Sequence, residues 1–396
     1  MIDLNIVAPL MFVGLAIVML LGYPVAFSLA ALGLAFGFVG VQLGFFPAQY
    51  LANIPLRIFG ILSNDLLLAI PFFTFMGAIL ERCGLAEDLL EGTGQLFGSV
   101  PGGLAFAVVV VGAILGAITG TVAASVIAMG MIALPIMMRY GYDMKLATGV
   151  IAASGTITQL IPPSLVLIVL ADQLGKSVGD MYKGAIGPSI VQTLLFLVYI
   201  AAIALLRPQW VPPLPAEART MKGWKLIARV MWGMIPSIVL IFLVLGTIFM
   251  GLATPTEAGA MGAIGALVLA AMHRRLTRKL IWQAMDATMR LTAMVVFILI
   301  GSTLFTLVFQ GVDGGLWIEH MLTNLPGGAT GFLVFVMVFV FLLAFFLDFF
   351  EIAFIIIPLL APVATKLGID LIWFGVLLCV NMQTSFMHPP FGFALF

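Results

Sequence analysis

The sequence has few of the residues that cover the surface of a water-soluble protein. Charged side chains make up 9% of its 396 residues, while 63% are hydrophobic. The mean hydropathy is +1.24, and apolar runs near ~20 residues recur along the chain, which is the length that crosses a bilayer. These features exclude a soluble globule. They predict an α-helical protein that crosses a lipid bilayer several times.

Residues that carry redox, metal or nucleophilic chemistry are also scarce. Two cysteines and three histidines are present, and none has the spacing of a metal cluster, a disulfide framework or a nucleophile–base pair. An intramembrane enzyme is therefore a weak alternative to a transporter. The formal net charge is zero and no basic tail exists, so nucleic-acid binding has no support. The N-terminus lacks a positively charged region, which favours a first membrane helix over a cleaved signal.

What the sequence does contain is a proline pair, Pro162 and Pro163, inside an apolar run from about 146 to 170. Prolines have no backbone N–H and clash with the preceding turn, so a membrane helix must unwind there and leave carbonyl groups without partners. A kink satisfied by a neighbouring helix is the simpler alternative. The pattern occurs twice, however, because Pro389 and Pro390 interrupt a second apolar run.

The two proline pairs belong to an internal repeat with an offset of 227 residues. Residues at turns and helix breaks are identical at this offset: Pro135 and Pro362, Gly141 and Gly368, Asp143 and Asp370, Pro162 and Pro389, Pro163 and Pro390. A Pro-Gly-Gly turn at 101–103 also recurs at 326–328, after a shift of two residues. We infer two copies of one structural unit.

The basic residues indicate how the two copies are oriented. Ten of the 17 lysines and arginines lie in two connections, 207–229 and 274–290, which the positive-inside rule places in the cytoplasm. Two predicted spans, about 232–250 and 258–272, separate them and put them on the same side. The first half then has five full crossings, an odd number, with the N-terminus outside. The second copy is therefore expected to be inverted in the membrane.

The predicted fold is an all-α polytopic membrane protein of two inverted repeats, each with a re-entrant helical hairpin and a broken helix. The first repeat spans 1–206, with its hairpin at about 104–138 and its broken helix at about 146–171. A cytoplasmic connection, 207–231, leads to the second repeat, 232–396. There the hairpin lies at about 332–363 and the broken helix at about 372–396. Repeat symmetry predicts a further span of ~20 residues, so we interpret the C-terminus as truncated or incompletely recorded.

Polar groups at the hairpin centres and helix breaks are the candidates for function. Asp348 and Glu351 lie in an otherwise apolar hairpin, and ionisable residues at membrane depth mark ion or substrate pathways. Alternatively, both sit at a water-exposed tip or pair with a structural arginine. At 254–258, Pro255 or Thr256 is expected to open a helix with Glu257 in its first turn. The predicted substrate region comprises Ser125, Ser164, Glu351 and Gln383.

Several motifs occur together in this chain: Gly-Ala-Ile-Thr-Gly-Thr at 116–121, Ile-Pro-Pro-Ser at 161–164, Thr-Pro-Thr-Glu-Ala at 254–258, Gly-Ile-Asp at 368–370, Phe-Gly-Val at 374–376 and Pro-Pro-Phe-Gly at 389–392. Their combination resembles the large membrane subunit of tripartite ATP-independent periplasmic (TRAP) transporters over nearly the whole chain. The resemblance implies sodium-driven import of organic acid anions across the cell inner membrane by an elevator mechanism. It also implies two partners, a small four-helix membrane subunit and a periplasmic substrate-binding protein.

The resemblance implies two Na⁺ sites, each where a hairpin tip meets a broken helix. The first falls on six residues: Thr119, Gly120 and Thr121 of the hairpin with Thr158, Ile161 and Pro163 of the broken helix. Hydroxyls and unwound carbonyls are hard oxygen ligands, which suit such a cation. The second site falls on three residues: Asp348, Ser385 and His388.

Two residues depart from the family pattern. Thr158 stands where the family usually has Gly, and His388 stands where it usually has Thr. An imidazole offers nitrogen or becomes a cation itself. Three arrangements therefore stay open: Na⁺ binds through backbone carbonyls, the second site is lost, or protonation of His388 takes over part of the coupling.

Two other transport functions compete with this interpretation. A stand-alone anion transporter of related inverted-repeat design would need no binding protein. A passive channel fits less well, because hairpins of opposite entry suit alternating access.

Overall fold

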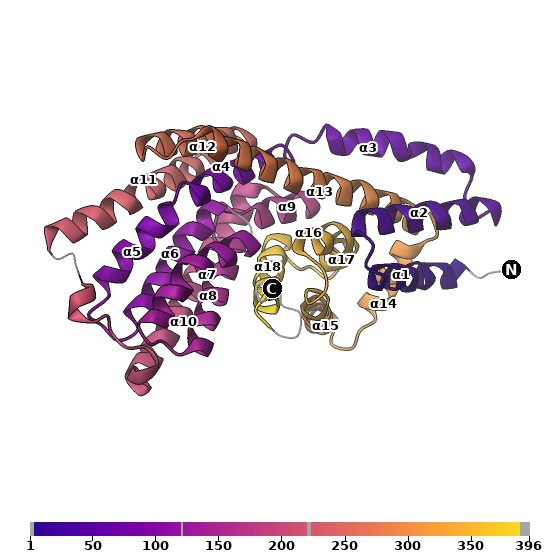
Figure 1. Ribbon diagram of the computed structural model, residues 1–396. Coiled ribbons are helices and arrows are strands. Elements are labelled where there is room, and N and C mark those ends of the chain that lie inside the picture. The colour runs from indigo at the N-terminus through magenta and orange to yellow at the C-terminus, as the bar shows by residue number, and fades with distance from the viewer. Residues whose placement is uncertain (1–3, 120–121, 220–222, 389–396) are drawn as a thin grey trace.

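The computed structural model describes residues 4–119, 122–219 and 223–388, and within these ranges the chain is helical without β-strands (Figure 1). The first repeat contains, in order, α1 (Leu4–Leu20), α2 (Val25–Gln42), η1 (Ala48–Asn53), α3 (Ile54–Leu62), α4 (Ala69–Arg82), α5 (Leu85–Leu96), α6 (Gly103–Thr119), α7 (Val122–Arg139), α8 (Met144–Thr156), η2 (Ile157–Gln159), α9 (Leu165–Gln173) and α10 (Val178–Leu206).

The second repeat follows the same order after a connection with two short 3₁₀ turns. It contains α11 (Trp224–Phe249), α12 (Pro255–Met272), α13 (Arg278–Gly311), α14 (Gly314–Thr323), α15 (Gly328–Leu343), α16 (Phe349–Glu351), the π-helical turn η5 (Ile352–Ile356), α17 (Ile357–Lys366) and α18 (Leu371–Phe386). Helix α11 begins at Trp224, inside the connection predicted for 207–231.

The fold class predicted from the sequence is confirmed. Helices α6 and α7 form the first hairpin, and α15 with α16, η5 and α17 forms the second. The first broken helix consists of α8, η2 and α9, and its equivalent in the second repeat begins with α18. In the described part of the chain, six helices are long and apolar enough to cross a membrane, or eight if each bent pair counts as one span.

The helices sort into two groups by their packing. Helices α1, α2, α4, α11, α12 and α13 pack on one another and are called the frame here; the hairpins and broken helices, α6–α9 and α15–α18, are called the hairpin block. In Figure 1, α12, α13 and α3 run along the upper side of the view, with α9, α16 and α17 beneath them. Helices α5 and α14 contact both groups, whereas α3 packs on α13 of the frame and α10 packs on the hairpin block.

Local sequence explains several helix ends. Asp143 and Asp370, a predicted repeat pair, each cap the helix that follows, α8 and α18, by accepting a backbone N–H bond. Helix α12 begins at Pro255, as predicted, but its cap is Thr254 and not Thr256. Thr254 and Glu257 form a capping box, in which each side chain accepts a bond from the other residue's backbone N–H.

Candidate functional site

The two broken helices meet at repeat-equivalent residues. The side-chain amide of Gln383 on α18 donates a hydrogen bond to the Thr156 hydroxyl at the end of α8, at 2.9 Å. The two residues are 227 positions apart, which is the repeat offset. Both are buried, and Gln383 also accepts a bond from Gln192 of α10. A contact between equivalent residues is what a pseudo-twofold axis through this point would produce.

The break after η2 follows from the proline pair. Pro162 and Pro163 cannot donate to the carbonyls of Thr158 and Gln159, which lie four residues earlier. The Gln159 carbonyl instead accepts bonds from the Ser164 hydroxyl and the Cys379 thiol. Ser164 also caps α9 by accepting from the N–H of Val166. Neighbouring side chains therefore serve part of the unwound backbone, as the simpler kink alternative expects.

The Thr158 side chain is not served in this way. Its hydroxyl is buried and has no hydrogen-bond partner among the described residues. A Cβ placed at Gly116 would lie 2.8 Å from the Thr158 Cα, so the missing side chain at this glycine lets α6 pack directly on η2. The C-terminal end of α6, at Thr119, carries partial negative charge. An unpaired hydroxyl beside the end of α6 has the chemistry of a Na⁺ ligand.

The structure therefore describes four of the six residues expected at the first Na⁺ site. Thr158, Ile161 and Pro163 lie at the break, and Thr119 ends α6. Gly120 and Thr121 lie outside the described residues. The described residues at the break offer neutral oxygen atoms as ligands, which suit a hard monovalent cation such as Na⁺.

The second hairpin tip uses its carboxylates for capping. Asp348 accepts from the N–H of Phe349 at 2.6 Å, and Glu351 accepts from the N–H of Asp348 at 3.0 Å. Together they form a capping box at the start of α16. The structure shows no ion pair between either carboxylate and a described arginine. Capping accounts for their position without an ion pathway.

Ser385 and His388 lie against α15 and not against the carboxylates. The Ser385 hydroxyl donates to the carbonyl of Phe341 at 2.6 Å. The His388 Nδ1 atom lies 2.7 Å from the Thr384 carbonyl, and its ring packs edge-on against Phe341 at 5.3 Å. The proline pair after His388 lies outside the described residues, so the second site stays a prediction.

The predicted substrate residues are divided between places. Ser164 and Gln383 lie at the centre of the hairpin block, Ser125 is buried on α7, and Glu351 caps α16. All four engage in contacts within the protein.

A polar cavity that the sequence analysis missed lies between the frame and the hairpin block. Its volume is about 330 Å³, at the lower end of the ~300–1,000 Å³ typical of small-molecule sites. One side of the cavity is formed by α3, by the segment between α3 and α4, and by α13: Arg57, Gly60, Ile61, Asn64, Leu67, Leu299, Ser302, Thr303 and Thr306. The other side is formed by the hairpin block: Asp172, Gln173, Phe354 and Pro358. A polar face on α13 at 302, 303 and 306 was the available signal, since helix neighbours three and four apart share a face.

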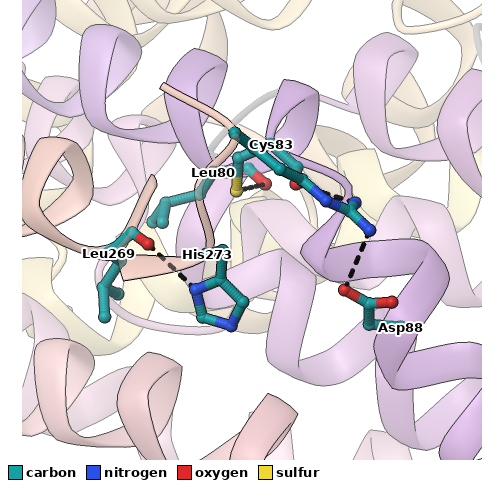
Figure 2. A network of polar contacts seen from close by, with 6 residues as sticks. Leu80, Cys83, Asp88, Leu269 and His273 are labelled. Carbon is teal, nitrogen blue, oxygen red and sulfur yellow. Dashed lines mark hydrogen bonds and ion pairs between the residues drawn. The ribbon is translucent and has the colours of Figure 1, made fainter. Parts of the chain in front are cut away.

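A bend of 60° separates α4, which belongs to the frame, from α5, which packs on α6. Gly84 lies at the bend with a φ of +74°, in the left-handed region that glycine favours. Arg275, from the connection between α12 and α13, donates to the Cys83 carbonyl at 2.9 Å and pairs with Asp88 of α5 at 3.3 Å. Figure 2 shows Cys83 and Asp88 within this network of polar contacts.

Comparison with known proteins identifies the family. The family model of the tripartite ATP-independent periplasmic transporter DctM component matches residues 12–396. The chain belongs to this family. The resemblance inferred from the motifs is thereby confirmed.

The relatives of this chain match it over most of its length. A C4-dicarboxylate TRAP transporter large permease protein of Pseudomonas aeruginosa is 31% identical over 89% of this chain and 81% of its own length. A protein of the same description from Rhodobacter capsulatus is 29% identical over 96% of this chain and 86% of its own length. The YdaH transporter of Alcanivorax borkumensis shares the fold, with a TM-score of 0.65 at 16% identity, over 93% of this chain and 90% of that one. The chain is therefore a polytopic TRAP transporter large permease.

Proposed function

We propose that this permease imports small organic acid anions across the inner membrane, driven by Na⁺, with an anion-binding protein delivering the substrate and a small membrane subunit beside it. The observation that carries sodium coupling is the buried hydroxyl of Thr158, which lies at the break near the end of α6 and has no hydrogen-bond partner among the described residues. An unpaired buried hydroxyl is unfavourable unless something binds it. A Na⁺ ion held by this hydroxyl and nearby carbonyls would satisfy it.

The polar cavity is the proposed place for the substrate anion. Arg57 contributes the positive charge, and Thr303 and Thr306 contribute hydroxyls on one face of α13. The cavity lies where the frame meets the hairpin block, so movement of the block past the frame would change its access. This arrangement supports an elevator mechanism, in which the block carries the anion.

Uptake by membrane vesicles tests the proposal. A panel of small organic acids is offered with and without an inward Na⁺ gradient, and with and without a purified periplasmic substrate-binding protein. We expect uptake to require both. Uptake that ignores the Na⁺ gradient would overturn sodium coupling, and uptake without the binding protein would favour the stand-alone transporter.

A further inference from the structure

The charges of the polar cavity select among organic acids. Two charged side chains line it, Arg57 of α3 and Asp172 at the end of α9. Arg57 is exposed toward the cavity and makes no ion pair with a described residue. One guanidinium can bind one carboxylate in a bidentate manner. The cavity thus offers a single full positive charge to a bound anion.

Asp172 is held in the cavity by a fixed set of hydrogen bonds. Its two oxygens accept from the side-chain amides of Asn64 at 2.9 Å and Gln173 at 2.8 Å. The Asn64 amide is itself oriented, because its oxygen accepts from the N–H of Leu66 at 3.0 Å. Hydrogen bonds from amides stabilise the carboxylate without cancelling its charge. A second carboxylate on a ligand would therefore meet a negative group that cannot turn away.

We propose that the cavity binds small monocarboxylates with a neutral polar oxygen and rejects dicarboxylates of the same length. Arg57 binds the carboxylate, while the hydroxyls of Thr303 and Thr306 remain for a keto or hydroxyl oxygen. Asp172 acts by repulsion, because specificity requires a cost for the wrong ligand as well as a gain for the right one. This inference rests on the proposed function and names the substrate class of that site.

A thiol at the cavity wall gives a readout that needs no binding protein. Ile61→Cys places it on α3, in the wall of the cavity, and the native Cys83 and Cys379 are 1% and 0% exposed. The full chain is purified with its small membrane subunit, and labelling by a methanethiosulfonate reagent is followed in the presence of Na⁺. Three four-carbon acids serve as probes: 2-oxobutyrate, 2-hydroxybutyrate and succinate. We expect both monocarboxylates to protect the thiol at concentrations at least about tenfold lower than succinate.

Substitutions at two positions in the reporter background test the role of each charge. Asp172→Asn keeps the shape and should lower the succinate concentration for half-protection by about tenfold, while protection by 2-oxobutyrate stays unchanged. Arg57→Gln should abolish protection by all three acids, and Arg57→Lys should restore part of it. Arg278→Gln, at the exposed start of α13, is the matched control and should change nothing.

Four results would overturn the inference. Equal protection by succinate and 2-oxobutyrate would show that the charge count does not select. An unchanged ratio in Asp172→Asn would remove Asp172 from selectivity. Vesicles that take up organic acids while no acid protects the thiol would place the substrate elsewhere, with the proposed function intact. Absence of both protection and uptake would overturn the proposed function as well.

Discussion

Single side chains decide how the hairpin block is held, and Tyr142 is one of them. Its phenol oxygen accepts a bond from the backbone N–H of Leu104 at 3.2 Å, in the first turn of α6, and the residue is 3% exposed. The first N–H groups of a helix have no partner within the helix. Tyr142 thus caps the first hairpin from the turn that joins it to α8.

We predict that Tyr142→Phe destabilises the protein. Removing the hydroxyl leaves the Leu104 N–H buried without an acceptor, which costs about 1–3 kcal/mol. The melting temperature of the purified protein in detergent measures the loss. Tyr199→Phe is the control, because Tyr199 is 56% exposed and should be silent. Equal melting of both variants and the native chain would contradict the capping role.

Tyr142→Phe should also change how the stability of the protein depends on alkaline pH. Burial raises the pKa of Tyr142 from 10.0 to about 12, although two backbone hydrogen bonds act in the opposite direction. The folded protein therefore keeps this proton when the unfolded chain has lost it, so stability falls as pH rises from 10 to 12. Tyr142→Phe should lose stability less steeply over this range, as followed by melting at a series of pH values.

Thr156 and Thr158 form a matched pair for the coupling ion. Thr156 accepts from Gln383, whereas the Thr158 hydroxyl has no partner among the described residues. Thr156→Val should therefore destabilise the protein by about 1 kcal/mol. Thr158→Val should leave melting without Na⁺ unchanged but raise the Na⁺ concentration for half-maximal uptake severalfold, since one oxygen ligand is lost. A native Na⁺ response in Thr158→Val would remove this residue from the site.

At the scale of elements, the bends between frame and hairpin block are clamped by loops of the opposite repeat. Arg275, in the second repeat, holds the bend between α4 and α5 in the first. Tyr50, in the first repeat, donates to the Leu307 carbonyl at 3.1 Å, near the end of α13. A Cβ at Gly311 would meet the Tyr50 ring at 2.9 Å, so this loop also packs on the turn into α14. The contact made by Arg275 is ionic, and the one made by Tyr50 is aromatic.

We predict that Arg275→Gln loosens the bend at Gly84. The substitution removes the charged bond to the Cys83 carbonyl and the pair with Asp88, which is partly solvent-exposed. Spin labels on the exposed faces of α4 and α5 should show a broader distance distribution and uptake should slow, with little change in melting. Arg278→Gln serves as the control, because Arg278 makes no ion pair with a described residue. An unchanged distribution would show that packing alone fixes the bend.

The sequence predicted the helices and their breaks better than it predicted contacts between residues far apart in the chain. The proline pair specified the break in the first broken helix, and small residues around 116–125 marked the hairpin tip, since both act through local backbone chemistry. The pairing of Asn64 with Asp172 and of Arg275 with Asp88 was missed, because these partners lie 108 and 187 residues apart and no local rule links them. Asp348 and Glu351 form a capping box, which their spacing of three residues could have predicted, and their part in an ion pathway stays a prediction.

At the scale of the whole molecule, the inverted repeat fixes which loops face which compartment. We predict that the connections 207–229 and 274–290 face the cytoplasm, and that 172–183 and 311–325 face outward. Glu217→Cys and Lys176→Cys, both at exposed positions, test this in a cysteine-free background. An impermeant thiol reagent added to intact cells should label the second variant and spare the first. Labelling of Glu217→Cys from outside would contradict the inverted arrangement.

The clamp on the α4–α5 bend bears on how the protein is made. Arg275 lies 192 residues after Cys83, the residue whose carbonyl it binds. A ribosome adds ~5–20 residues per second. Helices α4 and α5 are therefore made roughly ten seconds or more before Arg275, which holds the bend between them. During that interval the first hairpin is synthesised while the α4–α5 bend lacks its contacts with Arg275. Correct placement of the first half is therefore settled late in synthesis, when the second half arrives to hold it.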